Sequence, residues 1–152
     1  MTSGLSQPVP FAWPVRVYWE DTDAGGVVYH ASYLRFLERA RSEWLRGLGV
    51  DQSALKRDTG LAFMVREMHL DFLRPALLDD ELAVGVDVKA CRPASILFGQ
   101  YIRRAPGEEL IRAEVRVACV DVRRMRPVPI PPPLLAIVQG GATQPADDAP
   151  RT

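Results

Sequence analysis

An acidic segment with two glycines, residues 20–33, carries the side chains of this sequence that are best suited to chemistry. Within it Asp23 precedes a turn of small residues, and His30 follows at the start of the only long helical pattern. A helix N-terminus presents unpaired N–H groups and a partial positive charge, so it can stabilise an oxyanion. A carboxylate opposite those donors could attack a polarised carbonyl, or could activate water to do so. The segment therefore predicts a hydrolytic site on a strand–turn–helix unit.

Three other carboxylates compete with Asp23 for this role. In an extended strand Asp21 and Asp23 share one face, but Asp21 lies farther from the helix start and ranks second. Glu20 is a further candidate. Glu43 lies inside the helical pattern, where a structural or solvated position is expected. A plain turn is the alternative for the whole segment, because Asp and Gly are common turn formers.

The elements around this segment follow from the spacing of apolar residues. Residues 12–19 alternate between apolar and polar, which predicts a strand, and Pro14 indicates that it starts late or lies at a sheet edge. From Ser32 to about Gly49 the period is three to four, which predicts an amphipathic helix with Ser32 as N-cap and Gly47 and Gly49 as its stop. Its exposed surface is expected to hold five charged residues: Arg35, Glu38, Arg39, Arg41 and Glu43.

The rest of the chain has mainly the alternating pattern of strands. Residues 51–60 predict a short helical turn and a loop, four strands follow, and the last three form an antiparallel meander. Residues 134–139 predict one helical turn. We therefore expect an α+β fold with one domain at 11–139, in which a five-stranded antiparallel sheet wraps around a long central helix. Residues 1–10 are expected to be flexible and residues 140–152 to be a disordered tail.

Composition narrows the possible functions. Lys and Arg together number 19, as do Asp and Glu, so a formal charge of zero gives no electrostatic case for binding nucleic acid. His30 and His69 lack the spacing of metal ligands to each other or to Cys91 and Cys119, so no metal site is predicted. The cysteines are expected to be buried thiols and His69 to be a surface residue. The chain has no apolar run long enough for membrane insertion and no apolar signal region, so the predicted location is cytoplasmic.

Five segments carry a resemblance to a known family: Trp13–Tyr18, Glu20–Tyr33, Glu38–Arg41, Leu70–Ala76 and Cys119–Asp121. They resemble the 4-hydroxybenzoyl-CoA thioesterase family, whose members have the hotdog fold. More narrowly, the chain is similar to the YbgC-type acyl-CoA thioesterases associated with the bacterial Tol–Pal cell-envelope system. The resemblance covers about residues 11–138 and implies a single hotdog domain.

The resemblance also implies roles for individual residues. The family's catalytic aspartate directly precedes the Ala-Gly turn, the position of Asp23 here, and acts as nucleophile or as general base on water. His30 takes the place whose backbone N–H points at the thioester carbonyl, and its ring would help to orient substrate or deliver a proton. Tyr29, Gly25 and Gly26 would shape the approach to the site.

Further substrate-binding residues are expected outside this segment: Tyr33, Arg92, Ser95, Arg124 and Arg126. Arg92 and Ser95 match a family loop that usually has the sequence Arg-Gly-Thr-Ser, but here Pro93 stiffens the turn and removes a backbone donor. The basic run at residues 123–126 would hold the phosphates of coenzyme A, or it is a solvated strand end.

The expected activity is hydrolysis of acyl-CoA to a free acid and coenzyme A, with no cofactor besides the coenzyme A of the substrate. The alternatives are hydrolysis of acyl groups on acyl carrier protein, and an acyl-binding or scaffold protein without catalysis. Edge strands need a cover, and the resemblance implies a homo-oligomer, either a dimer or a tetramer of two dimers. In it the Asp23–His30 segment would meet residues such as Met64–Met68 of the partner subunit.

Overall fold

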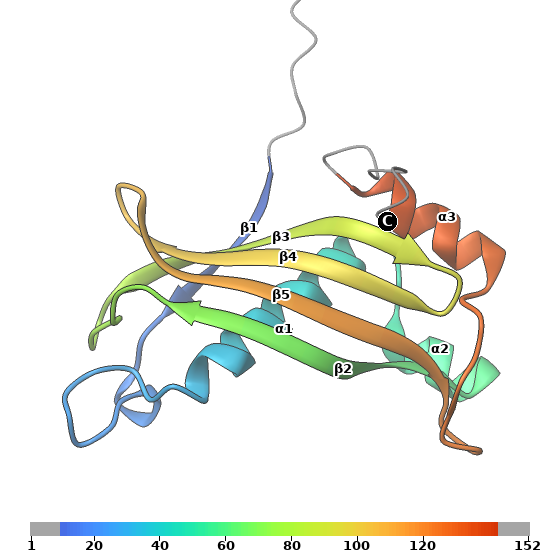
Figure 1. The fold of residues 1–152 in the computed structure, drawn as a ribbon, viewed down its shortest axis with the longest axis horizontal. Coiled ribbons are helices and arrows are strands. Elements are labelled where there is room, and N and C mark those ends of the chain that lie inside the picture. The colour runs from blue at the N-terminus through green and yellow to red at the C-terminus, as the bar shows by residue number, and fades with distance from the viewer. Residues whose placement is uncertain (1–9, 143–152) are drawn as a thin grey trace, which may run out of the picture.

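A curved antiparallel sheet packs over one long helix in the computed structural model, which describes residues 10–142 (Figure 1). The strands are β1 (Phe11–Arg16), β2 (Leu61–Phe72), β3 (Glu81–Arg92), β4 (Ser95–Arg104), β5 (Glu108–Asp121) and β6 (Arg126–Pro127). The helices are α1 (Ser32–Gly47), α2 (Gln52–Thr59) and α3 (Pro132–Gly140), with a 3-10 turn at Trp19–Asp21. The predicted α+β arrangement is confirmed, and the two-residue β6 is an addition to it.

The five long strands follow the order β1-β3-β4-β5-β2, and all neighbours are antiparallel. β3, β4 and β5 form the predicted meander. Pro14 lies opposite Ala83 in the edge strand β1, as its missing N–H led us to expect. β2 is the other edge, so over residues 10–142 one side of this twelve-residue strand has no strand partner.

Helix α1 packs an apolar side against the sheet, and this contact forms the core of the molecule (Figure 1). Phe36, Leu37 and Ala40 are fully buried. Trp44 meets Phe98 of β4 edge to face, with ring centroids 5.6 Å apart. Burying one large apolar side chain contributes about 1.5–3 kcal/mol, so the helix and the sheet stabilise each other.

The ends of β1 and α1 differ from the sequence prediction. β1 ends at Arg16 rather than at residue 19, because residues 19–21 form a tight turn. Ser32 was expected to be the N-cap of α1, and this prediction is wrong. Ser32 is the first helical residue, while Ala31 occupies the cap position and offers no side-chain acceptor.

Arg41 was expected on the surface of α1, and this prediction is also wrong, because its exposed fraction is only 7%. One guanidinium nitrogen donates to Oε1 of Gln100 on β4 at 3.0 Å. The amide nitrogen of Gln100 donates in turn to the backbone carbonyl of Leu37 at 3.1 Å. Burial lowers the pKa of Arg41. This polar pair therefore links helix to sheet inside an otherwise apolar layer.

The shorter elements are longer than the sequence suggested. The predicted helical turn within residues 51–60 is the helix α2, capped by Asp51, whose carboxylate accepts the N–H of Ala54 at 3.0 Å. The turn expected at residues 134–139 is the nine-residue α3, which takes in part of the predicted tail. Residues 141–142 of that tail follow α3 in the described part, whereas residues 143–152 and residues 1–9 lie outside it. No helix within the described residues is long and apolar enough to cross a membrane.

Candidate active site

Residues 22–28 form a small hairpin that carries Asp23 at its turn. The N–H of Asp23 donates to the carbonyl of Val27 at 2.9 Å, and the N–H of Gly26 donates to the carbonyl of Asp23 at 3.0 Å. The N–H of Gly25 donates to Oδ1 of Asp23 at 2.8 Å. Gly26 has a φ of 81°, a conformation that favours glycine. The turn predicted as the alternative is therefore present, and it fixes the backbone of Asp23.

The side chain of Asp23 remains exposed in this turn. Only one of its carboxylate oxygens accepts a hydrogen bond within the described residues, from Gly25. The second oxygen is therefore open to solvent or to a ligand. No hydrogen bond or ion pair within residues 10–142 joins Asp23 to His30.

His30 and Ala31 connect this hairpin to helix α1. The N–H of Tyr29 donates to the carbonyl of Asp21, and the N–H of Ser32 donates to the carbonyl of Tyr29, both at 2.8 Å. The N–H groups of His30 and Ala31 have no hydrogen-bond partner in the part of the chain that the structure describes, and no side chain caps the helix. The start of α1 thus offers free backbone donors, as helix N-termini do. The exposed rings of Tyr29 and His30 lie together, with centroids 4.4 Å apart.

Tyr33 is buried beneath the hairpin and binds the segment between β2 and β3. Its hydroxyl oxygen accepts the N–H of Ala76 at 3.0 Å, and the carbonyl of Ala76 accepts the N–H of Val28 at 2.9 Å. Burial raises the pKa of Tyr33, and the negative charge of Asp23 makes a smaller contribution in the same direction. Tyr33 therefore supports the hairpin through Ala76.

Two of the competing carboxylates are engaged in other contacts. Asp21 is only 5% exposed, and its Oδ2 accepts the N–H of Tyr18 at 2.8 Å, which stabilises the 3-10 turn. Glu43 forms an ion pair with Arg46 one turn further along α1. Glu20 is exposed on the 3-10 turn. Exposure therefore favours Asp23 over Asp21 as the catalytic carboxylate, and Glu20 remains the main alternative.

The remaining predicted site residues lie at the opposite end of the sheet. The end of β1 nearest the hairpin pairs with the first residue of β3, and the twelve residues of β3 span roughly 36 Å at the usual rise per residue. Arg92 and Ser95 face each other at the far end of β3, across the turn into β4. Arg124 and Arg126 follow β5 at this same end. A single chain therefore does not bring these four residues to Asp23.

Three other residues agree wholly or partly with their sequence predictions. His69 is a surface residue with an exposed side chain, 3.3 Å from the carboxylate of Asp71. Cys119 is buried, whereas Cys91 is half-buried. Burial raises the pKa of both thiols, so neither has the environment of a reactive cysteine.

Sequence patterns did not reveal how the segment at residues 73–80 supports the site. Ala76 contacts the Asp23 hairpin, and Leu77 pairs with Val27 of that hairpin. The only signal at these positions was the family resemblance at Leu70–Ala76. Nothing in the sequence indicated that Arg104, at the end of β4, would bind this segment as it does.

Comparisons with known proteins agree with this fold. Residues 17–138 match the family model of the thioesterase-like superfamily. The acyl-CoA thioesterase YbgC of Haemophilus influenzae is 50% identical over 121 residues, which cover 80% of this chain and 88% of that protein. The acyl-CoA thioester hydrolase YbgC of Escherichia coli O6:H1 is 48% identical over 126 residues, which cover 83% of this chain and 93% of that protein.

A solved structure gives the same result. The probable thioesterase from Bartonella henselae matches with a TM-score of 0.75 and 36% sequence identity, over 81% of this chain and 100% of that chain. The predicted hotdog fold and the family resemblance are therefore confirmed. The chain is a thioester hydrolase that belongs to the thioesterase-like superfamily, within the group that contains the YbgC proteins.

Proposed function

We propose that the protein hydrolyses acyl-CoA to a free acid and coenzyme A, with Asp23 as nucleophile or general base. The observation that carries this proposal is the exposed Asp23 carboxylate, on a hydrogen-bonded hairpin that continues directly into the uncapped start of α1. Relatives that are about half identical over most of the chain are named acyl-CoA thioesterases, which supports this substrate class.

In the proposed mechanism the thioester carbonyl oxygen accepts the backbone N–H of His30 as negative charge develops on it. The positive end of the α1 dipole adds to this stabilisation. Asp23 then attacks the carbonyl carbon to form an anhydride that water cleaves, or it removes a proton from the water that attacks. In either route the C–S bond breaks, and the departing thiolate takes up a proton, for which the exposed His30 ring is our candidate donor. Backbone and side chains suffice for both routes, so we propose that the reaction uses no cofactor.

The separation of the two groups of site residues supports a site built from two chains. The edge of β2 has no strand partner within the described residues, and an antiparallel pair of β2 strands would cover it. Phe72, at the end of β2, packs against Tyr33 under the hairpin, with ring centroids 5.9 Å apart. Leu61, at the start of β2, pairs with the last residue of β5, close to Arg124.

Antiparallel pairing of two β2 strands would bring the Phe72 end of one subunit to the Leu61 end of the other. We therefore propose a dimer in which Asp23 works with Arg124 of the partner subunit and Arg126 of the partner subunit, whose guanidinium groups bind phosphates of coenzyme A. Assembly of two such dimers to a tetramer, a cytoplasmic location, and a link to the Tol–Pal system stay predictions.

The test is thiol release from a panel of acyl-CoA substrates that vary in chain length and include aromatic acyl groups. We expect hydrolysis of at least one substrate, and Asp23→Asn should lower kcat by about a hundredfold or more, because the amide can neither attack nor accept a proton. Asp51→Asn is the matched control, because Asn caps a helix as well as Asp does. A loss of activity in Glu20→Gln, with Asp23→Asn fully active, would transfer the role to Glu20.

Two further outcomes separate the alternative functions. Hydrolysis of acyl groups on acyl carrier protein, with none from acyl-CoA, would replace the proposed substrate by the carrier-bound thioester. Saturable binding of acyl-CoA to folded protein without any thiol release would identify an acyl-binding or scaffold protein and would contradict the proposed activity.

A further inference from the structure

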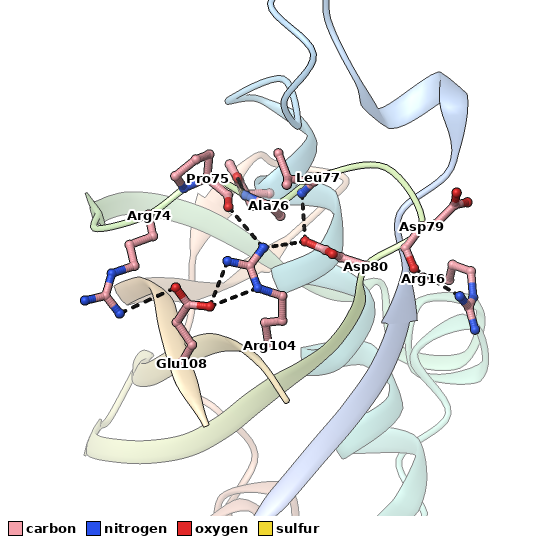
Figure 2. A network of polar contacts seen from close by, with 10 residues as sticks. Arg16, Arg74, Pro75, Ala76, Leu77, Asp79, Asp80, Arg104 and Glu108 are labelled. Atoms are coloured by element: carbon pink, nitrogen blue, oxygen red, sulfur yellow. Dashed lines mark hydrogen bonds and ion pairs between the residues drawn. The ribbon is translucent and has the colours of Figure 1, made fainter. Parts of the chain in front are cut away.

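The side chain of Arg104, at the end of β4, joins two carboxylates to the backbone of the 73–80 segment (Figure 2). Its Nη1 donates to Oδ2 of Asp80 at 2.6 Å and to the carbonyl of Pro75 at 3.4 Å. Its Nε and Nη2 donate to Oε2 of Glu108 at 3.0 and 2.8 Å. These hydrogen bonds to Glu108 and Asp80 raise the pKa of Arg104. One guanidinium thus holds three groups, two from the 73–80 segment and one from the start of β5.

The Asp80 carboxylate, one of the two that Arg104 binds, also fixes the part of the segment that contacts the Asp23 hairpin. Oδ2 of Asp80 accepts the N–H of Leu77 at 2.8 Å, as well as the bond from Arg104. Leu77 pairs with Val27, and the neighbouring carbonyl of Ala76 accepts the N–H of Val28. A chain of direct contacts therefore leads from Arg104, through Asp80 and residues 76–77, to the hairpin.

A second set of contacts anchors the other end of this segment to the chain after β1. The N–H of Val17 donates to the carbonyl of Asp80, and the N–H of Asp79 donates to the carbonyl of Val17, both at 3.0 Å. Arg16 donates to the carbonyl of Asp79 at 3.0 Å, as Figure 2 shows. Residues 79–80 are therefore held independently of Arg104. Among the described residues, the backbone carbonyl of Pro75 accepts a side-chain hydrogen bond only from Arg104.

We propose that Arg104 is a positioning residue for the active site, which sets the place of the Asp23 hairpin through the 73–80 segment. The inference rests on the proposed role of Asp23. An arginine suits this task because its planar fork donates in several fixed directions, whereas a lysine supplies a single compact charge. Removal of the guanidinium would leave Asp80 and Glu108 without the cation they share. Tyr33 would still hold Ala76, but the Pro75–Leu77 stretch would lose the bond from Arg104 to Pro75 and the fixed place of the Asp80 carboxylate. It could then shift, and the hairpin with it.

The test combines kinetics with hydrogen–deuterium exchange on the full chain. In Arg104→Gln we expect kcat to fall about tenfold to a hundredfold, because small displacements of reacting groups are costly, while KM stays within about twofold. Amide exchange in peptides covering residues 22–31 and 73–80 should become about tenfold faster, since local opening sets the exchange rate. Arg104→Lys should recover part of both losses. It also provides a second variant if Arg104→Gln does not fold.

Arg112→Gln is the matched control. The exposed Arg112 donates from two nitrogens to the half-buried Glu109, at 3.1 and 2.8 Å. It has no contact with the 73–80 segment among the described residues. Its exchange and kcat should match the wild type. Unchanged exchange in Arg104→Gln would overturn the inference, and faster exchange with full kcat would overturn its catalytic part. A wild-type protein without thioesterase activity would refute the proposed function, while the exchange data would still show whether Arg104 holds the hairpin.

Discussion

At the scale of single residues, Asp23 combines a structural and a chemical task. One carboxylate oxygen accepts the N–H of Gly25 and closes the turn, while the other has no partner within the described residues. The turn thereby holds the carboxylate in a narrow range of positions without pairing it with a cation among the described residues. Because one oxygen serves the turn and the other is left for catalysis, an aspartate followed by glycines fits both a turn and a catalytic site at this position.

His30 divides its proposed contribution between backbone and ring, and substitution separates the two. His30→Ala keeps the backbone N–H at the start of α1, so we expect a smaller loss of kcat than in Asp23→Asn if the N–H dominates. A loss as large as that of Asp23→Asn would assign the main effect to the ring. In that case the pH profile of kcat should lose one limb in His30→Ala. Steady-state kinetics of both variants over a range of pH makes this comparison.

At the scale of elements, the sequence predicted what depends on local patterns. The five long strands and α1 follow from apolar periods within a few residues, which is why their number and order were correct, whereas the two-residue β6 was not predicted. The burial of Arg41 depends on Gln100, 59 positions away, and the support of the hairpin depends on a bond between residues 43 positions apart. Spacing along the chain carries no information about such contacts. For the same reason Asp23 and His30 could be grouped from sequence, whereas the distance of Arg92 from them required the strand register.

The bond between α1 and the 73–80 segment gives a prediction on stability. Tyr33→Phe leaves the buried N–H of Ala76 without its acceptor, so the free energy of unfolding at neutral pH should fall by about 1–3 kcal/mol. Tyr101→Phe is the control, because the hydroxyl of Tyr101 makes no hydrogen bond within residues 10–142, and its stability should stay near that of the wild type. Urea unfolding of the two variants tests this. Equal stability would contradict a structural role for the Tyr33 hydroxyl.

The burial of the Tyr33 hydroxyl makes the stability of the wild type sensitive to high pH. Burial raises the pKa of Tyr33 in the folded state, so the folded protein keeps a proton that the unfolded chain loses above about pH 10. The contribution of protonated Tyr33 to the free energy of unfolding is therefore complete below the pKa of tyrosine in the unfolded chain. It is lost as pH rises through the higher pKa of Tyr33 in the folded state. Tyr33→Phe should show a smaller loss of stability above pH 10 than the wild type.

At the scale of the whole molecule, the fold separates groups that the proposed chemistry needs together. The hairpin with Asp23 lies at one end of the sheet, and Arg124 and Arg126 lie at the other. In the proposed dimer, two-fold antiparallel pairing through β2 would exchange these ends between subunits. It would also cover the edge of β2 that has no strand partner within residues 10–142. Assembly would thus complete two sites with the same set of contacts that stabilises the dimer.

Complementation between two inactive variants tests this shared site. We would mix Asp23→Asn protein with an Arg124→Ala, Arg126→Ala double variant and allow the subunits to exchange. In a mixed dimer one site has both defects, whereas the other combines an intact Asp23 with the intact arginines of the partner subunit. If half of the dimers are mixed, about a quarter of the wild-type activity should return. The control mixes Asp23→Asn with a chain that carries all three substitutions, where no complete site can form. Absence of recovery, with exchange verified by native mass spectrometry, or a fully active monomer in light scattering, would contradict the shared site and leave the chemistry of Asp23 to be explained within one chain.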